Sequence, residues 1–142
     1  MPNRRGQAGR SGGDGRMRMR VGIVHGRLTA PSGTTLQVAA LARELSNRGH
    51  DVHVIGVGPR HRMLDFEGAT IHQTRARSLD VVDSAKNCPP LIALTLKLVT
   101  AHGFDVIHAH YAVAGLAALV NRVINGTPYL MNLHGYEPKF LS

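Results

Sequence analysis

Residues 20–49 read RVGIVHGRLTAPSGTTLQVAALARELSNRG, and this stretch decides the fold. Its start holds an apolar run of strand length, formed by Val21, Ile23 and Val24. Its second half carries apolar residues at helical spacing, namely Val38, Leu41, Ala42 and Leu45. Gly49 follows at a position typical of a left-handed helix end. The stretch therefore predicts a buried strand, a turn and an amphipathic helix whose apolar stripe faces a sheet.

The turn between this strand and helix, residues 31–35, is the first candidate binding site. Thr34 and Gln37 match the Ser/Thr-x-x-Gln pattern of a capping box, which predicts that the helix begins at Gly33 or Thr34. Amide groups at a helix start lack intrahelical partners and lie at the positive end of the helix dipole, so they favour an anion such as phosphate. The alternative is that Pro31 and Gly33 only turn the chain, and both interpretations stay open.

The rest of the chain continues the same alternation of strands and helices. We expect strands at residues 51–57, 105–110 and 128–134, a weaker edge strand at residues 69–74, and helices at residues 91–102 and 113–124. The last of these helices is almost wholly apolar, so we expect other parts of the protein to cover it on most sides. The alternation predicts an α/β fold with a doubly wound parallel sheet. Gly56 and Gly58 do not form a dinucleotide fingerprint, because the third glycine of that motif is absent.

The composition indicates one domain and a basic tail. Residues 1–19 hold five arginines, one aspartate and few apolar residues, so we expect them to be disordered ahead of a folded domain at residues 20–142. The tail carries half of the net charge of +8, and the remaining charge is spread without interleaved aromatic residues. This distribution argues against nucleic-acid binding. It is compatible with an anionic membrane surface or a phosphorylated substrate.

The sequence also indicates where the protein works. Cys88 is the single cysteine, so no intrachain disulfide can form. The tail is not followed by the apolar core of about 7–15 residues that a secretory signal needs. The longest apolar stretch, residues 111–120, is shorter than the roughly 20 residues that span a membrane. We therefore expect a cytoplasmic protein, with peripheral contact to the inner membrane face as an open alternative.

Histidines recur where the expected strands end. The carboxyl ends of parallel strands meet at one edge, and ligands bind there, at the point where the strand order reverses. This geometry would bring His110 and His134 beside the turn at Gly33, where an imidazole would hydrogen-bond a sugar hydroxyl or a phosphate near neutral pH. For His25, at the end of the first strand, a buried histidine that closes the strand is the simpler interpretation.

Three other residues near this edge are less informative. Glu137 would either bond a hydroxyl group or be an ordinary exposed carboxylate, and Arg27 would either meet an anion or be solvated. His108 and His110 share one strand face, and such a pair can bind zinc. No third ligand of the right kind stands nearby in sequence, so we expect no metal site and interpret His108 as a core residue.

Three segments together carry a resemblance to a known family. The first is the strand RVGIVH with Pro31-x-Gly33 and the helix-to-strand passage of residues 41–52; the second is DVIHAH, residues 105–110; the third is LHGYE, residues 133–137. Over residues 18–138 the chain resembles the N-terminal domain of family-4 glycosyltransferases.

This resemblance implies a GT-B fold of two Rossmann-like domains, of which the N-terminal one mainly holds the acceptor. The other domain mainly holds a nucleotide sugar, and the reaction retains the anomeric configuration, commonly without a required metal or other cofactor. By motif position, Gly33 would lie near the donor phosphates with Thr34 beside it, His134 would lie in the catalytic cleft, and His110 would line it. The implied ligands are a nucleotide sugar and a sugar or lipid-linked acceptor.

The chain departs from the family pattern in two ways. The family often has two glycines in the first turn, where this chain has Gly33 and Thr34, which weakens the expectation of close phosphate approach. Family members also carry a donor-binding domain of comparable size, which these residues do not contain. We therefore expect an acceptor-side domain that is inactive alone, either as a fragment or truncated gene product or as one subunit of a split transferase whose donor domain lies on a separate chain. A stand-alone nucleotide- or phosphate-binding module and a basic peripheral membrane-binding protein remain alternatives.

Overall fold

The computed structural model describes residues 15, 17–26, 28, 32–58, 65–75 and 85–133. The strands are β1 (Arg20–His25), β2 (Asp51–Val57), β3 (Thr70–Thr74), β4 (Val106–His110) and β5 (Tyr129–Asn132). The helices are α1 (Gly33–Asn47), α2 (Cys88–His102) and α3 (Tyr111–Asn125), with a short 3-10 helix, η2 (Ala85–Asn87), before α2. Each predicted strand and helix is present close to its predicted position.

The five strands form one sheet in the order β3-β2-β1-β4-β5, and every neighbouring pair is parallel. The predicted α/β fold with a doubly wound parallel sheet is thus confirmed, including β3 at an edge. The chain moves outward from β1 to β2 and β3 and then crosses back to β4 on the other side of β1. The strand order therefore reverses between β1 and β4, which is where such sheets bind ligands.

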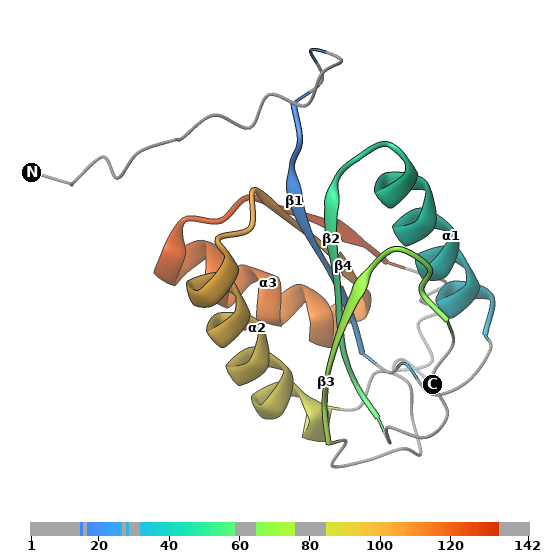
Figure 1. The fold of residues 1–142 in the computed structure, drawn as a ribbon. Helices are drawn as coiled ribbons and strands as arrows, with labels where there is room; N and C mark the ends of the chain where they lie inside the picture. The colour runs from blue at the N-terminus through green and yellow to red at the C-terminus, as the bar shows by residue number, and fades with distance from the viewer. Residues whose placement is uncertain are drawn as a thin grey trace, which may run out of the picture.

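Helices cover both faces of this sheet (Figure 1). α2 and α3 pack side by side on one face, and α1 lies on the other. Successive strand residues point to opposite faces, so each strand contributes side chains to two hydrophobic cores, one on each face of the sheet. The core on the α1 side includes Ile23, Val38, Val54 and Phe66, and the core on the α2 and α3 side includes Val24, Ile55, Leu91 and Ile107. Burial on both faces explains why the strands read as continuous apolar runs.

The start of α1 agrees with the prediction, but its cap does not. Ser32 precedes the helix in an extended conformation, and its hydroxyl accepts a hydrogen bond of 3.2 Å from the amide of Thr35. The predicted pairing of Thr34 with Gln37 is wrong because Thr34 already lies inside the helix, and its hydroxyl bonds Tyr111 instead. The helix end is as predicted, since Gly49 has the left-handed φ of 88°.

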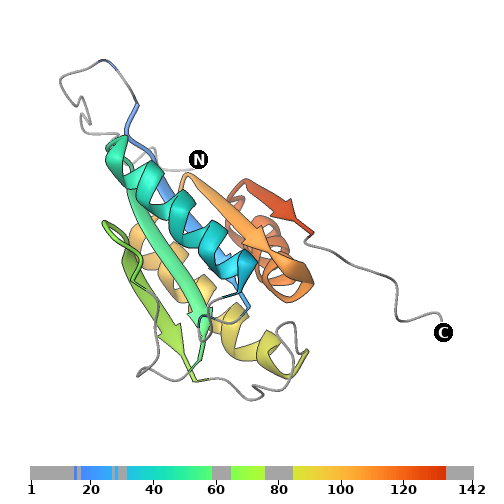
Figure 2. The same ribbon diagram turned by 90° about the vertical axis from the view of Figure 1, so that its right-hand side faces the viewer.

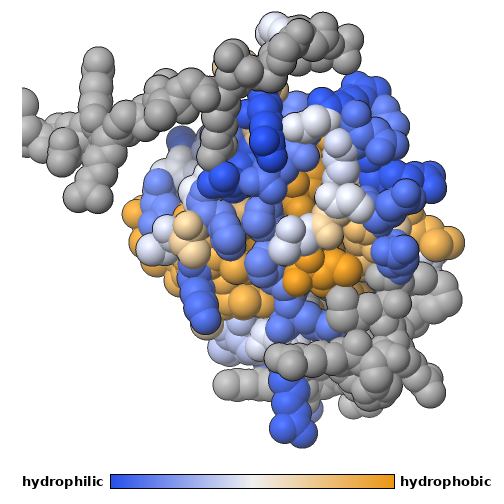
Figure 3. Space-filling model, viewed as in Figure 1, coloured by the Kyte–Doolittle hydropathy of each residue, from blue (hydrophilic) through white to orange (hydrophobic). Residues whose placement is uncertain are grey.

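α3 is less covered than predicted. Ala114, Ala117 and Ala118 are buried on the helix face that meets the rest of the protein. Its opposite side exposes four large apolar residues by 44–76%, namely Leu116, Leu119, Val123 and Ile124. The apolar surface on the left of the space-filling view lies over α2 and α3 (Figure 3). Within the described ranges, α3 packs against α2, β1, β4 and β5 and against no element on its outer side, so these side chains face solvent.

The sheet face opposite α2 and α3 is also only partly covered. α1 contacts β1 and β2, whereas β4 and β5 lie beside it without a helix over them (Figure 2). Leu130 of β5 points to this face because it pairs with His108, and it is 62% exposed. α1 covers β1 on this face, but it does not cover the neighbouring strand β4. The carboxyl ends of β1 and β4 therefore lie at the border of the area that α1 covers.

Candidate functional site

The point where the strand order reverses brings two histidines together. The register of β1 and β4 places His25 directly opposite His110, and each is the last residue of its strand. Their ring centroids are 6.2 Å apart, and both side chains are buried, with 0% and 2% exposure. His108 stands two residues earlier on the same face, and its ring centroid lies 4.4 Å from that of His110. The predicted convergence of strand-end histidines is therefore present for the two strands on either side of the reversal.

The start of α1 joins the same edge through a hydrogen bond between Thr34 and Tyr111. Thr34 Oγ1 and the Tyr111 hydroxyl lie 2.7 Å apart, which connects the first turn of α1 to the first residue of α3. The Tyr111 ring also meets the His25 ring edge-on, with centroids 5.5 Å apart. We call His25, Thr34, His110 and Tyr111 the switch-point cluster.

Tyr111 has an unusual backbone conformation. Its φ is 73°, and it is the only non-glycine residue with positive φ in the part of the chain that the structure describes. This left-handed conformation costs a residue with a side chain on the order of 1–3 kcal/mol, and such strain concentrates at functional sites. The strain lets the chain pass from β4 into α3 without a loop while the Tyr111 ring turns toward Thr34 and His25.

The α1 start is open to an approaching ligand. The Ser32 hydroxyl accepts a hydrogen bond from the Thr35 amide, and the Ser32 carbonyl accepts one from the Leu36 amide. Helix geometry gives the two preceding amides, of Gly33 and Thr34, no intrahelical partner. Among the described residues, a Cβ added to Gly33 would meet no atom within 4 Å. The amides of this surface can therefore donate hydrogen bonds to an anion at the positive end of the α1 dipole.

Three of the six predicted site residues lie together at this edge, and the other three fall outside the part of the chain that the structure describes. Gly33, Thr34 and His110 belong to the edge where the strand order reverses. Arg27, His134 and Glu137 are outside the described residues. The chemical groups gathered here are hydroxyls, an imidazole and helix amides, which suit hydrogen bonding to sugar hydroxyls and phosphate oxygens.

Two features of the structure were not predicted from the sequence. Tyr111 follows the DVIHAH segment directly, and its position between a strand and a helix without a loop was the available signal. The second feature is a cluster of His53, His72 and His102 in another part of the sheet. These residues belong to three different elements, so sequence spacing alone does not reveal them.

In the described part of the chain, none of the helices combines the length and the apolar character that crossing a membrane requires.

Solved structures with a similar fold include a glycosyltransferase and a hydrogenase domain. MurG from Acinetobacter baumannii aligns with a TM-score of 0.58 and 18% identity over 82% of this chain, and the chain spans only 35% of MurG. The C-terminal domain of the PF1911 hydrogenase from Pyrococcus furiosus aligns with a TM-score of 0.56 and 14% identity, over 87% of this chain and 100% of that domain structure. A second structure of that domain gives a TM-score of 0.57. At these identities the similarity concerns the fold alone.

Comparison with curated proteins gave no match. The family model described as Glycosyltransferase Family 4, however, matches residues 31–142, which is most of the chain. This match includes α1, the carboxyl ends of β2 to β5 and all but His25 of the switch-point cluster. The chain belongs to glycosyltransferase family 4.

Proposed function

We propose that this chain is the acceptor-side domain of a retaining glycosyltransferase that takes its sugar from a nucleotide-sugar donor. The observation that supports this most directly is the position of the switch-point cluster. It lies at the carboxyl edge of a family-4 domain, at the reversal of strand order where α/β sheets bind ligands.

In this proposal the donor sits mainly on a second domain that faces this edge. Sugar transfer needs the two reactants aligned and shielded from water, so one wall of the cleft is insufficient. The span of 35% of MurG is consistent with a chain that supplies one such wall. We therefore expect activity only when a donor-binding domain, on this or another chain, completes the cleft.

The proposed roles follow from the chemistry of each group. The amides of Gly33 and Thr34 hold donor phosphate oxygens, and the Thr34 hydroxyl, positioned by Tyr111, bonds a ligand hydroxyl. His110 is buried, so it supports the cleft floor and donates a hydrogen bond only where the ligand reaches the strand end. His134 and Glu137 follow β5, and Arg27 follows β1, so their sequence positions favour the same edge. We propose His134 as the catalytic-cleft histidine.

The net charge of +8 supports an anionic acceptor, either a phosphorylated sugar or a lipid-linked one. Both sources share the phosphate chemistry that a basic domain attracts. Acceptor mixtures with and without lipid would distinguish them.

Reconstitution tests the proposal. The purified chain, a family-4 donor-binding domain, first taken from the adjacent reading frame, and their mixture are each incubated with UDP-glucose, UDP-N-acetylglucosamine and GDP-mannose. A lipid extract and a set of sugar phosphates serve as acceptor sources, and released UDP or GDP is measured. We expect release from the mixture with at least one donor and none from either part alone. Full activity of the chain alone, or inactivity of the mixture with every donor although the two domains bind each other, would contradict the proposal.

Calorimetry separates the main alternative, a nucleotide-binding module without catalysis. The chain alone is titrated with UDP and GDP. Tight binding that the donor domain does not change, together with no release in the mixture, would favour the module. Binding that appears or strengthens only when the donor domain is present supports the glycosyltransferase.

A further inference from the structure

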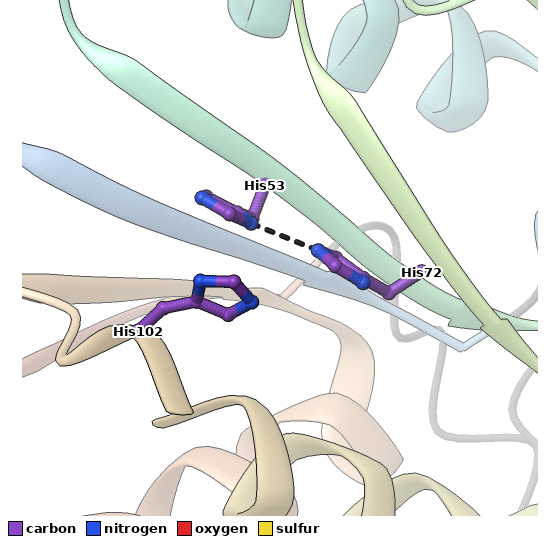
Figure 4. Close-up of side chains that lie close together, drawn as sticks. All are labelled: His53, His72 and His102. Carbon is purple, nitrogen blue, oxygen red and sulfur yellow. Dashed lines mark hydrogen bonds between the residues drawn. The ribbon is translucent and has the colours of Figure 1, made fainter. Parts of the chain in front are cut away.

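Three histidines converge on the α2 side of the sheet, away from the switch-point cluster (Figure 4). His53 comes from β2, His72 from β3, and His102 is the last residue of α2. Each offers one ring nitrogen, and these three nitrogens lie within 4.8 Å of one another. His53 Nδ1 and His72 Nε2 lie 2.8 Å apart, within hydrogen-bond distance.

The fold explains why these residues meet. His72 pairs with Ile55, and Ile55 lies two residues after His53 in β2, so both histidines point to the same face of the sheet. α2 packs on this face and ends at His102, because Gly103 adopts a left-handed φ of 68° and stops the helix. The His53 ring lies 4.6 Å from that of His102, centroid to centroid, and the His72 ring lies 5.6 Å from it.

A carboxylate and a guanidinium hold this arrangement in place. Asp51 Oδ1 lies 3.2 Å from His53 Nε2, while Asp51 Oδ2 accepts a 2.7 Å hydrogen bond from Arg20 Nε. Arg20 Nη1 also donates to the carbonyl of His102. This His53–Asp51 contact has ion-pair distance without hydrogen-bond geometry among the described residues. With its proton on Nε2, beside Asp51, His53 would keep the Nδ1 lone pair facing His72. A histidine that ligates a metal commonly donates its other ring N–H to a carboxylate, and Asp51 is close enough to take that role after a small rotation.

The local electrostatics favour the neutral rings that bind metals. Burial, together with the charges of His102 and Arg20, lowers the pKa of His53 more than the nearby Asp51 carboxylate raises it. Burial also lowers the pKa of His72, and the adjacent His53 and His102 lower it further. For Asp51, burial raises the pKa, but the hydrogen bond from Arg20 and the charges of His53 and Arg20 outweigh it and hold the pKa below its usual value.

We propose that His53, His72 and His102 form a structural zinc site. In a tetrahedral site with Zn–N distances of 2.0–2.1 Å, ligand nitrogens are about 3.3 Å apart. His53 and His72 would separate slightly from their 2.8 Å contact, and the His102 nitrogen would move closer. Before the ion binds, one proton lies between His53 Nδ1 and His72 Nε2. The ion takes the place of this proton, and the proton moves to His72 Nδ1, so the site releases no proton.

The surroundings leave a path for the ion. His53 is 4% exposed, whereas His72 and His102 are half-buried and border solvent. A water molecule can therefore occupy the fourth position. Three imidazoles suit Zn²⁺ and other late first-row ions, whereas Mg²⁺ and Ca²⁺ prefer oxygen ligands. Zinc at this position would tie the edge strand β3 to β2 and to the end of α2.

Cobalt and zinc titrations test the site. The full chain is prepared without a histidine tag, stripped with EDTA and titrated with Co²⁺, whose visible absorption reports tetrahedral coordination, and Zn²⁺ then displaces it. We expect one equivalent with a tetrahedral spectrum and no binding of Mg²⁺. His72→Gln and His102→Gln should each weaken binding at least tenfold, and Asp51→Asn, which removes the carboxylate behind His53, by about 10–100-fold.

His108→Gln is the matched control, because it removes one member of the other close histidine pair. We expect unchanged cobalt binding in this variant. Equal binding by wild type, His72→Gln and His102→Gln, or loss of binding in His108→Gln, would overturn the proposal. Circular dichroism of each metal-free variant confirms folding, and if His72→Gln does not fold, His102→Gln, at the half-buried helix end, decides the outcome.

Discussion

Tyr111 combines a strained backbone with a hydrogen bond that joins two helices. Its φ of 73° is unfavourable for any residue with a Cβ, yet it aims the hydroxyl at Thr34 Oγ1, 2.7 Å away. The strain is therefore offset by contacts at the edge where the candidate site lies. Backbone torsion at one residue leaves no periodic pattern in a sequence, which is why this feature could not be predicted, although His110 beside it was.

The bond between Thr34 and Tyr111 can be isolated with a double-mutant cycle. Tyr111→Phe and Thr34→Val each remove one hydroxyl, and we expect each to lower the free energy of unfolding by about 0.5–1.5 kcal/mol. The double variant should lose clearly less than the sum of the two single losses, because both changes break the same bond. Urea unfolding measures all four proteins. Strictly additive losses would show that the two hydroxyls do not interact.

Substitution by alanine should affect the free energy of unfolding differently at two glycines. A Cβ at Gly56 would lie 2.5 Å from Leu28 Cγ and 2.9 Å from the carbonyl oxygen of His25, whereas one at Gly33 would meet nothing within 4 Å. We expect Gly56→Ala to lower the free energy of unfolding by about 1–3 kcal/mol through overpacking. Gly33→Ala should leave it unchanged or raise it by up to about 1 kcal/mol. Denaturant unfolding of both variants checks this contrast, and equal effects would contradict the described packing.

The helices and strands with strong apolar patterns could be predicted from the sequence. Which other elements pack against them could not. Val21, Ile23 and Val24 identified β1, and β3 was correctly expected at an edge. The covering of α3 was predicted wrongly, because an apolar sequence shows what favours burial and not which neighbours are present. The meeting of β2, β3 and α2 at three histidines depends on strand register and on where a helix ends, and neither is encoded at a fixed spacing.

These three elements also predict how stability depends on pH in metal-free protein. The pKa values of His53 and His72 are below 6.5 in the folded state, so both rings are neutral in folded and unfolded chains at higher pH. As the pH falls through 6.5 the unfolded chain binds protons first, and stability is lost down to the folded pKa values. The Asp51 carboxylate, the Arg20 guanidinium and the His102 ring are the ionisable groups facing this pair.

In EDTA, we therefore expect the free energy of unfolding to decrease between pH 7.5 and pH 5.5. Asp51 does not contribute in this range, because its pKa is below 3.8 and its loss of stability comes at more acid pH. His72→Gln should show a smaller decrease. Urea unfolding at several pH values measures both proteins, and a wild type that becomes more stable toward pH 5.5 would contradict the assigned direction.

For the molecule as a whole, the sequence was sufficient to predict a doubly wound parallel sheet, and it favoured the carboxyl edge of that sheet as the place of the candidate site. The strand order β3-β2-β1-β4-β5 then places the ends of β1 and β4 side by side, which unites Gly33, Thr34 and His110. Strand order was not predictable from the sequence pattern, because it depends on which side of β1 each crossover returns. We propose that this edge forms one wall of a sugar-transfer cleft.

The decisive measurement is the ratio kcat/KM of the reconstituted enzyme. It is determined for variants at this edge and for a control variant far from the edge. Thr34→Val and His110→Gln alter the proposed cleft, whereas Glu44→Gln alters an exposed side chain that pairs with Arg48 on the surface of α1. With folding of each variant confirmed by circular dichroism, we predict at least a tenfold loss for both cleft variants, equivalent to about 1.4 kcal/mol of transition-state stabilisation. The control should match wild type. Cleft variants as active as wild type, or a loss confined to Glu44→Gln, would show that this edge is not a wall of the sugar-transfer cleft.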